Sequence, residues 1–340
     1  MKIRALFFHT FSIKNIHINK VLLRKLLKRG TKYFKKIEKY AIMGENGVKQ
    51  ALDFANYLDF TAKEPFDFAM HSSIGCGGKA PIAFYPDSIV QLSELIEKLK
   101  KDGVRYYVLG KLTNVLPPDG LSSFVVVSTK KLDTIAVGDS VFAYAGITSG
   151  ALLRACRQAK RSGAEFLSGI PCTLGGALYM NAGADGKYIC EIVESVLVLR
   201  DGKRRILSLE ECAYGYKKSV FMDNEDIILG ASLRLEQATQ EEIDRRENYY
   251  QQRRAHLPKG RSMGCVFKNP PQKSAGALIE GCGLKGMRVG GAVISTEHAN
   301  FILNDKGATP TDIRALITLT KNAVYSQYGI CLEEEIRYLR

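Results

Sequence analysis

Three stretches of the chain repeat apolar residues at the spacing of an amphipathic helix. The stretch 88–103 opens with a serine that can cap a helix and ends at a glycine, and 149–162 repeats the apolar stripe. The stretch 309–329 starts with threonine and proline, the order favoured at a helix start, and also ends at a glycine. A fourth, charged helix is expected over 237–254, where it connects to the last part of the chain.

Short runs rich in β-branched and aromatic residues lie between these helices and predict strands. The expected strands are 105–109, 124–127, 141–145, 195–199, 205–209, 227–235 and 332–339. Asp201-Gly202 is a turn dipeptide between two of these runs and predicts a hairpin. Helices and strands mixed along the whole chain predict an α+β fold.

Net charge is concentrated at the N-terminus. Residues 1–40 hold twelve Lys or Arg against the single acid Glu38, which is +11 of the total +14 and leaves 14 − 11 = +3 for the other 300 residues. Leucines at helical spacing among these lysines would suit an arm for RNA or anionic lipid. We favour a dispensable extension, with Met43 as an alternative start, because ordinary composition begins there.

Composition places the chain among globular proteins, with 46% hydrophobic and 25% charged residues. No stretch approaches the ~18 apolar residues of a membrane span, and His9, Thr10 and Lys14 interrupt the apolar start before it can form a secretion signal. The eight cysteines lack a CxxC pair and zinc spacing. We therefore expect a cytoplasmic protein with reduced thiols, no membrane span and no metal site.

Glycine and small residues are concentrated in four clusters, at 75–78, 110–114, 169–176 and 281–291. One such cluster is most simply a turn that needs positive φ. Several clusters on β-α units indicate backbone N–H groups arranged for a long phosphate-bearing ligand such as a dinucleotide. The GxGxxG fingerprint after a strand is absent, which argues against a Rossmann site.

The order of the motifs resembles one known family. The motifs are HSSIGCGGKA, VLGKLTNVL, GIPCTLGGALYMNAGADG, YGYKKSVF, GCVFKNP, SAGALIEGCGLKGMRVGGAVIS, HANFILN and LEEEIRYL. From about His71 to Leu339 they resemble the bacterial UDP-N-acetylenolpyruvoylglucosamine reductases of cell-wall synthesis, in the branch with the compact (type II) last domain.

This resemblance implies a fold and an organisation. A two-part FAD-binding module of the vanillyl-alcohol-oxidase (PCMH) type would precede a C-terminal α+β substrate-binding domain. We accordingly expect the basic extension over 1–42, FAD-binding subdomains over 43–120 and 121–236, and the substrate domain over 237–340.

The resemblance also implies an activity. The family is a flavoprotein oxidoreductase in peptidoglycan synthesis, and thus in cell-wall biogenesis, cell shape and cell division. It passes a hydride from NADPH to FAD and then to an enolpyruvyl nucleotide sugar, giving UDP-N-acetylmuramate. The expected partner is this small-molecule substrate, with no nucleic acid, and a monomer is expected.

Three residues stand at the family's catalytic positions. Cys265 occupies the proton donor's place, where the family has serine, and a thiol is the stronger acid of the two. Lys217 stands where an arginine stabilises developing charge, so the positive charge remains without the bidentate fork. Glu335 matches the carboxylate that polarises the substrate; strand alternation alone does not distinguish it from Glu333.

The remaining site residues follow from the same motifs. Expected FAD contacts are Ser72, Ser73, Gly77, Gly78, Gly110, Thr113, Asn114, Cys172, Thr173, Gly175, Gly176, Asn181, Ala182 and Gly183. Expected substrate contacts are Tyr216, Lys268 and Asn269, whereas His298 is expected to be structural. Gly75 replaces a common Arg or Lys, and Leu112 and Cys172 replace glycines; a Cβ at a positive-φ position would cost about 1–2 kcal/mol.

Two other functions stay open at this point. The first is a flavoprotein of the same fold with an altered substrate or lost activity, suggested by the departures at Gly75, Leu112, Cys172, Lys217 and Cys265. The second is an RNA-binding or membrane-surface-binding protein that uses the basic N-terminal segment. Deletion of the residues before Met43 distinguishes the second, because only a binding arm would lose function.

Overall fold

The computed structural model describes residues 62–63 and 65–339. The predicted extension over 1–42, and the RNA- or membrane-binding arm within it, lie outside the described residues. The helices are α5 (Phe68–His71), α6 (Ile89–Lys101), α7 (Ser149–Gln158), α8 (Leu174–Met180), α9 (Gln240–Arg254), α10 (Ala275–Gly281) and α11 (Pro310–Tyr328). None of the helices described here is both long and apolar enough to cross a membrane.

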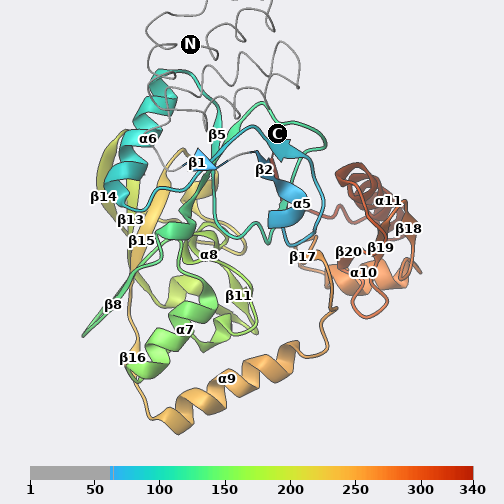
Figure 1. Cartoon of the computed structure of the whole chain (residues 1–340). Coiled ribbons are helices and arrows are strands. Elements are labelled where there is room, and N and C mark those ends of the chain that lie inside the picture. The colour runs from blue at the N-terminus through green and yellow to red at the C-terminus, as the bar shows by residue number, and fades with distance from the viewer. Residues whose placement is uncertain (1–61, 64, 340) are drawn as a thin grey trace, which may run out of the picture. The chain divides into compact units, whose positions relative to one another are not determined.

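Three larger sheets carry the architecture (Figure 1). The first has the order β1 (Ala62–Lys63), β4 (Ala83–Phe84), β7 (Val125–Ser128), β5 (Tyr106–Leu109). The second has the order β14 (Lys203–Ser208), β13 (Val193–Arg200), β15 (Ile227–Leu233), β9 (Val141–Tyr144), β8 (Ile135–Val137). The third has the order β17 (Ser262–Cys265), β20 (Phe301–Asn304), β19 (Ala292–Ile294), β18 (Arg288–Val289).

Four two-stranded pairings complete the fold. They are β2 (Phe66–Asp67) with β3 (Lys79–Ala80), β10 (Arg161–Ser162) with β16 (Glu236–Gln237), β11 (Gly183–Ala184) with β12 (Lys187–Tyr188), and β6 (Val115–Leu116) with β21 (Arg337–Tyr338). The last pairing is parallel, and it brings the C-terminal residues back to the loop that follows β5.

Local capping chemistry fixes the ends of the predicted helices. The Ser88 side chain accepts a hydrogen bond from the Gln91 N–H at the start of α6. Thr309 forms a capping box at the start of α11, and Gly329 ends that helix in the left-handed conformation, with φ +66°. The turn of the predicted hairpin has positive φ at both Asp201 (+49°) and Gly202 (+73°), which joins β13 to β14.

Several elements differ from the sequence-based expectations, and two of the differences are informative. The strand predicted over 332–339 is wrong in length, because only Arg337–Tyr338 pairs as a strand. The preceding backbone crosses between other segments instead: Glu335 N donates to Val266 O and Arg337 N donates to Asn114 O. Helix α8 was not predicted, because two glycines in its first turn mask the apolar period.

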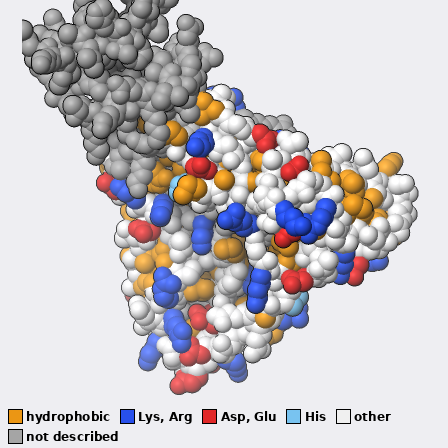
Figure 2. All heavy atoms as spheres, turned by 45° about the vertical axis from the view of Figure 1, so that its right-hand side comes forward, with side chains coloured by type: hydrophobic (Ala, Val, Ile, Leu, Met, Phe, Trp, Pro, Cys, Tyr) orange, Lys and Arg blue, Asp and Glu red, His pale blue; other side chains and the backbone are white. Residues whose placement is uncertain are grey.

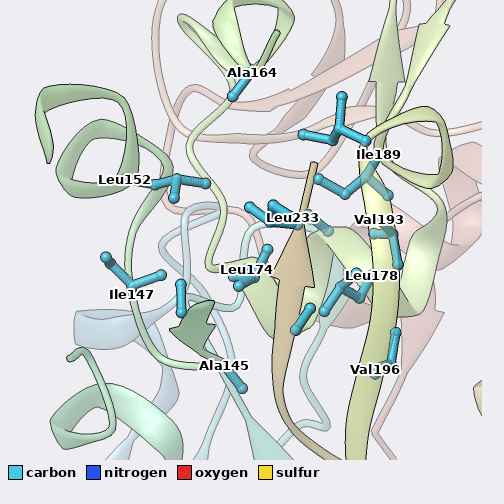
Figure 3. Close-up of a cluster of buried hydrophobic side chains, with 14 of the residues drawn as sticks. Ala145, Ile147, Leu152, Ala164, Leu174, Leu178, Ile189, Val193, Val196 and Leu233 are labelled. Carbon is cyan, nitrogen blue, oxygen red and sulfur yellow. The ribbon is translucent and has the colours of Figure 1, made fainter. Parts of the chain in front are cut away.

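Buried clusters connect parts of the chain that lie far apart in sequence. One cluster joins the second sheet to α7 and α8, and Figure 3 shows Leu152, Leu174 and Leu178 turned toward the same core as Leu233. Ile74 is buried with the side chains of α10 and α11, whereas Leu339 is buried with those of the first sheet. Strand β7 joins the first sheet, so that sheet continues past the predicted boundary at residue 120.

Charge is mixed on the one face of the described surface that Figure 2 shows. On the face shown in Figure 2, basic side chains are interspersed with acidic ones. This distribution agrees with the small surplus of +3 that the sequence assigns to the residues beyond Tyr40.

Candidate active site

A cavity of about 1480 Å³ is lined by residues from the first, second and third sheets and from the loops between them. Its wall includes the loop 110–114, the loop 169–173, the turn at Tyr216 and Lys217, the end of β17 and the segment before β21. This volume is larger than that of the usual small-molecule site and suits an extended ligand beside a second one.

The loop that follows β5 has the properties of an anion-binding loop. In the described chain, no backbone carbonyl accepts a hydrogen bond from the N–H groups of Lys111, Leu112, Thr113 and Asn114. Leu112 has φ +51°, and successive N–H groups around a left-handed residue form a concavity that binds anions. The loop therefore fits a diphosphate, although Leu112 adopts a conformation that favours glycine.

Close packing brings this loop against the start of α8. An added Cβ at Gly110 would lie 2.2 Å from Thr173 Oγ1, and one at Gly175 would lie 2.9 Å from Ala145 Cβ. Gly110 thus admits the Thr173 side chain, and Gly175 admits Ala145, at distances that a side chain on the glycine would not permit. Cys172 has no positive φ, so its replacement of a glycine carries no backbone strain.

At another part of the wall, Lys217 Nζ lies 2.8 Å from Glu335 Oε1, and both side chains are largely buried. Lys217 has φ +52° in a tight turn, in which Gly215 and Lys218 exchange backbone hydrogen bonds. The Asn181 amide donates to Gly215 O at 2.9 Å, and this contact holds the turn against the end of α8. The ion pair therefore connects residues that three separate segments position.

Cys265 ends β17 in the same cavity. Burial, and to a smaller extent Glu335, raises the pKa of its thiol to about 11, while Lys217 and Arg254 oppose that rise. The thiol consequently keeps its proton at neutral pH. Asn300 fixes this strand end, because its amide donates to Phe267 O at 2.8 Å and accepts from Phe267 N at 2.9 Å.

The structure brings most of the predicted residues to the cavity wall. Those that line it are Cys265, Lys217, Glu335, Ser73, Gly110, Thr113, Asn114, Cys172, Thr173, Gly175, Gly176, Ala182, Gly183, Tyr216 and Asn269. Tyr216 Oη accepts a hydrogen bond from Asn269 N at 3.2 Å, which joins the turn 215–218 to the segment that follows β17. The roles of all these cavity-lining residues toward cofactor and substrate stay predictions.

Five predicted contacts do not line the cavity: Ser72, Gly77, Gly78, Asn181 and Lys268. Ser72 Oγ donates to Cys76 O at 3.2 Å, and a Cβ at Gly78 would lie 1.6 Å from Gly120 O. Lys268 pairs with Glu333. In the structure these residues support the fold around the cavity, and their direct contact with a ligand stays a prediction.

His298 is also away from the cavity wall. Its Nδ1 accepts a hydrogen bond from Asn300 N at 3.2 Å, and burial lowers the pKa of its ring. This placement agrees with a structural role.

Sequence reasoning missed several basic residues in the wall, namely Lys111, Arg254, Lys259 and Arg337. The carboxylates there are compensated: Asp185, Glu225, Asp226 and Glu335 each have a Lys or Arg within ion-pair distance. Lys111, Arg254 and Lys259 have no such partner in the part of the chain that the structure describes. Together with the N–H groups of the loop 110–114, this surplus of positive charge fits FAD, whose diphosphate is anionic.

Two parts of the chain match known families. Residues 80–208 match the family of FAD binding domains, and residues 255–339 match the C-terminal domain of UDP-N-acetylenolpyruvoylglucosamine reductase. The cavity and the first match define the class: the chain is an FAD-dependent oxidoreductase with an α+β fold, as predicted.

Individual relatives give the family. The UDP-N-acetylenolpyruvoylglucosamine reductase of Geobacter metallireducens is 40% identical over 273 residues, which are 79% of this chain and 91% of the relative. That of Thermotoga petrophila is 38% identical over 273 residues, 78% of this chain and 94% of the relative. The crystal structure of the Thermus caldophilus enzyme superposes with a TM-score of 0.72 at 33% identity, covering 82% of this chain and 98% of the other. The chain belongs to the UDP-N-acetylenolpyruvoylglucosamine reductase family.

Proposed function

We propose that this chain reduces UDP-N-acetylglucosamine enolpyruvate to UDP-N-acetylmuramate with electrons from NADPH. The observation that carries the proposal is the meeting of Cys265, Lys217 and Glu335 in one cavity with an anion-binding loop. FAD, when bound, supplies the hydride chemistry, because it accepts a hydride from NADPH and donates one to a carbon acceptor. The loop 110–114 would hold the diphosphate of FAD.

The protein's own residues would supply the proton and the polarisation. Hydride addition to one carbon of the enolpyruvyl double bond leaves negative charge on its neighbour and on the carboxylate. The Cys265 thiol is protonated at neutral pH, and it would donate its proton to that neighbouring carbon. Solvent would restore the thiol proton after each turnover.

Lys217 and Glu335 would act as one unit. Their 2.8 Å contact fixes the ammonium group beside Cys265, where it can stabilise the charge that develops on the substrate. Because the pair is largely buried, it is already oriented before substrate binds. Tyr216 and Asn269, joined by a hydrogen bond on the same wall, would contact the nucleotide sugar.

Cellular role follows from this reaction. We further propose a monomeric, cytoplasmic enzyme of peptidoglycan synthesis, with the nucleotide sugar as its partner. A second candidate is a flavoprotein of the same fold with another substrate or no turnover. The left-handed φ of Leu112, in the loop that would hold the diphosphate, favours this candidate.

The visible spectrum of the purified full chain tests the proposal. Under anaerobic conditions, NADPH should bleach the flavin band, and only the enolpyruvyl nucleotide sugar should restore it. Bleaching without recovery would favour another acceptor. Protein that stays colourless after incubation with FAD would contradict both candidates.

A further inference from the structure

Arg254 is the last residue of α9, and its side chain lies in the wall of the cavity. The side chain passes the backbone at Gly169, which has φ +75°. A Cβ at Gly169 would lie 2.9 Å from Arg254 Cδ and 3.4 Å from Nε. Glycine at this position therefore leaves the space through which the guanidinium reaches the cavity.

The charge of Arg254 is not compensated by the protein. Its Nε is buried without a hydrogen-bond partner, and no carboxylate within the described residues lies at ion-pair distance. The neighbouring Arg253, by contrast, lies 3.1 Å from Asp185. Burial lowers the pKa of Arg254, and Asp185, which pairs with Arg253, only partly opposes that fall. A partly buried cation without an ion-pair partner is unfavourable until an anionic or acceptor group reaches it.

Arg254 also lies at the reacting end of the cavity. It is close enough to Cys265 and to Cys172 to lower the pKa of both thiols against the effect of burial. Lys217 and Glu335 neutralise each other, and the Cys265 thiol is uncharged at neutral pH. The surplus positive charge beside Cys265 therefore comes from Arg254.

We propose that the Arg254 guanidinium binds the pyrimidine edge of the FAD ring and stabilises the charge that the ring gains on reduction. This assignment rests on the proposed function. A hydride brings two electrons and one proton to a neutral ring, so the product carries one negative charge, delocalised over the pyrimidine edge. Arg254 would balance that charge without a second proton.

The same guanidinium chemistry also fits the carboxylate of the substrate. The ring is the better partner, because Lys217 and Glu335 already provide a polar group for the substrate beside Cys265. The flavin ring and the substrate carboxylate are distinguished by the midpoint potential of bound FAD, measured with no substrate present.

The test is the midpoint potential of bound FAD, measured anaerobically against a reference dye in the full-length chain without substrate. The variants are Arg254→Met and Arg254→Lys. Arg245→Met is the matched control, since Arg245 is exposed on the same helix. In Arg254→Met, the affinity for reduced FAD should fall at least ten-fold relative to the affinity for oxidised FAD. Each ten-fold loss lowers the midpoint potential by about 30 mV for a two-electron couple. Arg254→Lys should fall between parent and Met, and Arg245→Met should match the parent.

Contrary outcomes are distinguishable. An unchanged midpoint potential in Arg254→Met would overturn the assignment. If the KM for the nucleotide sugar rises while the potential stays at the parental value, Arg254 binds the substrate instead of the flavin ring. If Arg254→Met holds no FAD, Arg254→Lys and Gly169→Ala carry the test, because the alanine Cβ displaces the guanidinium. A full-length parent that binds no FAD would overturn the proposed function and this assignment with it.

Discussion

The loop 110–114 and the group formed by Lys217, Cys265 and Glu335 line one cavity, yet they depend on different features of the chain. The loop offers backbone N–H groups, so its fitness depends on conformation and on the absence of side chains, as at Gly110. The reacting group depends on side chains, whose charges compensate one another at 2.8 Å. Substitutions at the loop should therefore alter cofactor binding, and substitutions at the reacting group should alter turnover.

Cys265 gives the largest expected effect. Cys265→Ala removes the acidic proton, so reoxidation of the flavin by the nucleotide sugar should slow by about 10²–10⁴-fold. Cys265→Ser should keep much of that rate. Stopped-flow absorbance of each half-reaction measures this, with reduction by NADPH expected to be unchanged in both variants. Equal reoxidation rates in parent, Ser and Ala proteins would remove Cys265 from the mechanism.

Glu335→Gln should have the second-largest effect. The substitution preserves shape but leaves the Lys217 ammonium without its partner, so reoxidation should slow by about 10²-fold while FAD affinity stays near the parental value. Glu333→Gln is the control two residues earlier in the same segment, and its side chain is exposed. It should change the rate by less than about threefold. A larger loss at Glu333 than at Glu335 would reverse the assignment of the carboxylate.

The pH profile of reoxidation tests the thiol directly. A general acid acts only while protonated, and burial raises the pKa of Cys265 to about 11. The rate should therefore stay level through pH 9 and fall about ten-fold per pH unit above that pKa. Cys265→Ser should lack this falling limb. A limb centred near the ordinary cysteine value of 9.0 would show that the thiol is not shielded as described.

At the loop, Gly110→Ala should act on cofactor binding instead. The new Cβ would lie 2.2 Å from Thr173 Oγ1 and force the loop 110–114 away from α8. Overpacking of this kind costs about 1–3 kcal/mol, so the Kd for FAD should rise about ten-fold or more. Fluorescence titration with FAD measures it. Gly138→Ala is the control, because its Cβ would meet nothing closer than 3.8 Å.

Sequence patterns predicted the elements whose ends depend on neighbouring residues. Ser88 before α6 and Gly329 after α11 act within one helical turn, so their effect is visible in the sequence. Helix α8 was missed because of the two glycines in its first turn, of which Gly175 serves the packing against Ala145 of another segment rather than the helix itself. The strand predicted over 332–339 is shorter in the structure, because the Glu335 N–H donates to Val266 O instead of joining a regular ladder of strand hydrogen bonds.

The candidate site was predictable only in part. Resemblance brought out Lys217, Cys265 and Glu335, and strand alternation alone could not distinguish Glu335 from Glu333. Arg254 gave no signal, because it stands among many charged residues of α9 and its direction depends on the distant Gly169. Likewise, the cost of a side chain at Leu112 or Cys172, where the resemblance has glycine, depends on the backbone angle φ. The sequence does not show that angle.

Those two positions supply the smallest and most specific test. Leu112 has positive φ and Cys172 does not, although resemblance places a glycine at both. Alanine in the left-handed region costs about 1–2 kcal/mol, whereas elsewhere glycine is the less stable residue by about 0.5–1 kcal/mol. With saturating FAD, urea unfolding should find Leu112→Gly more stable than Leu112→Ala by about 1 kcal/mol, and Cys172→Ala at least as stable as Cys172→Gly. Both variants at one position lose similar burial, so their difference isolates the backbone. The same order at both positions would mean that Leu112 bears no conformational cost in the loop.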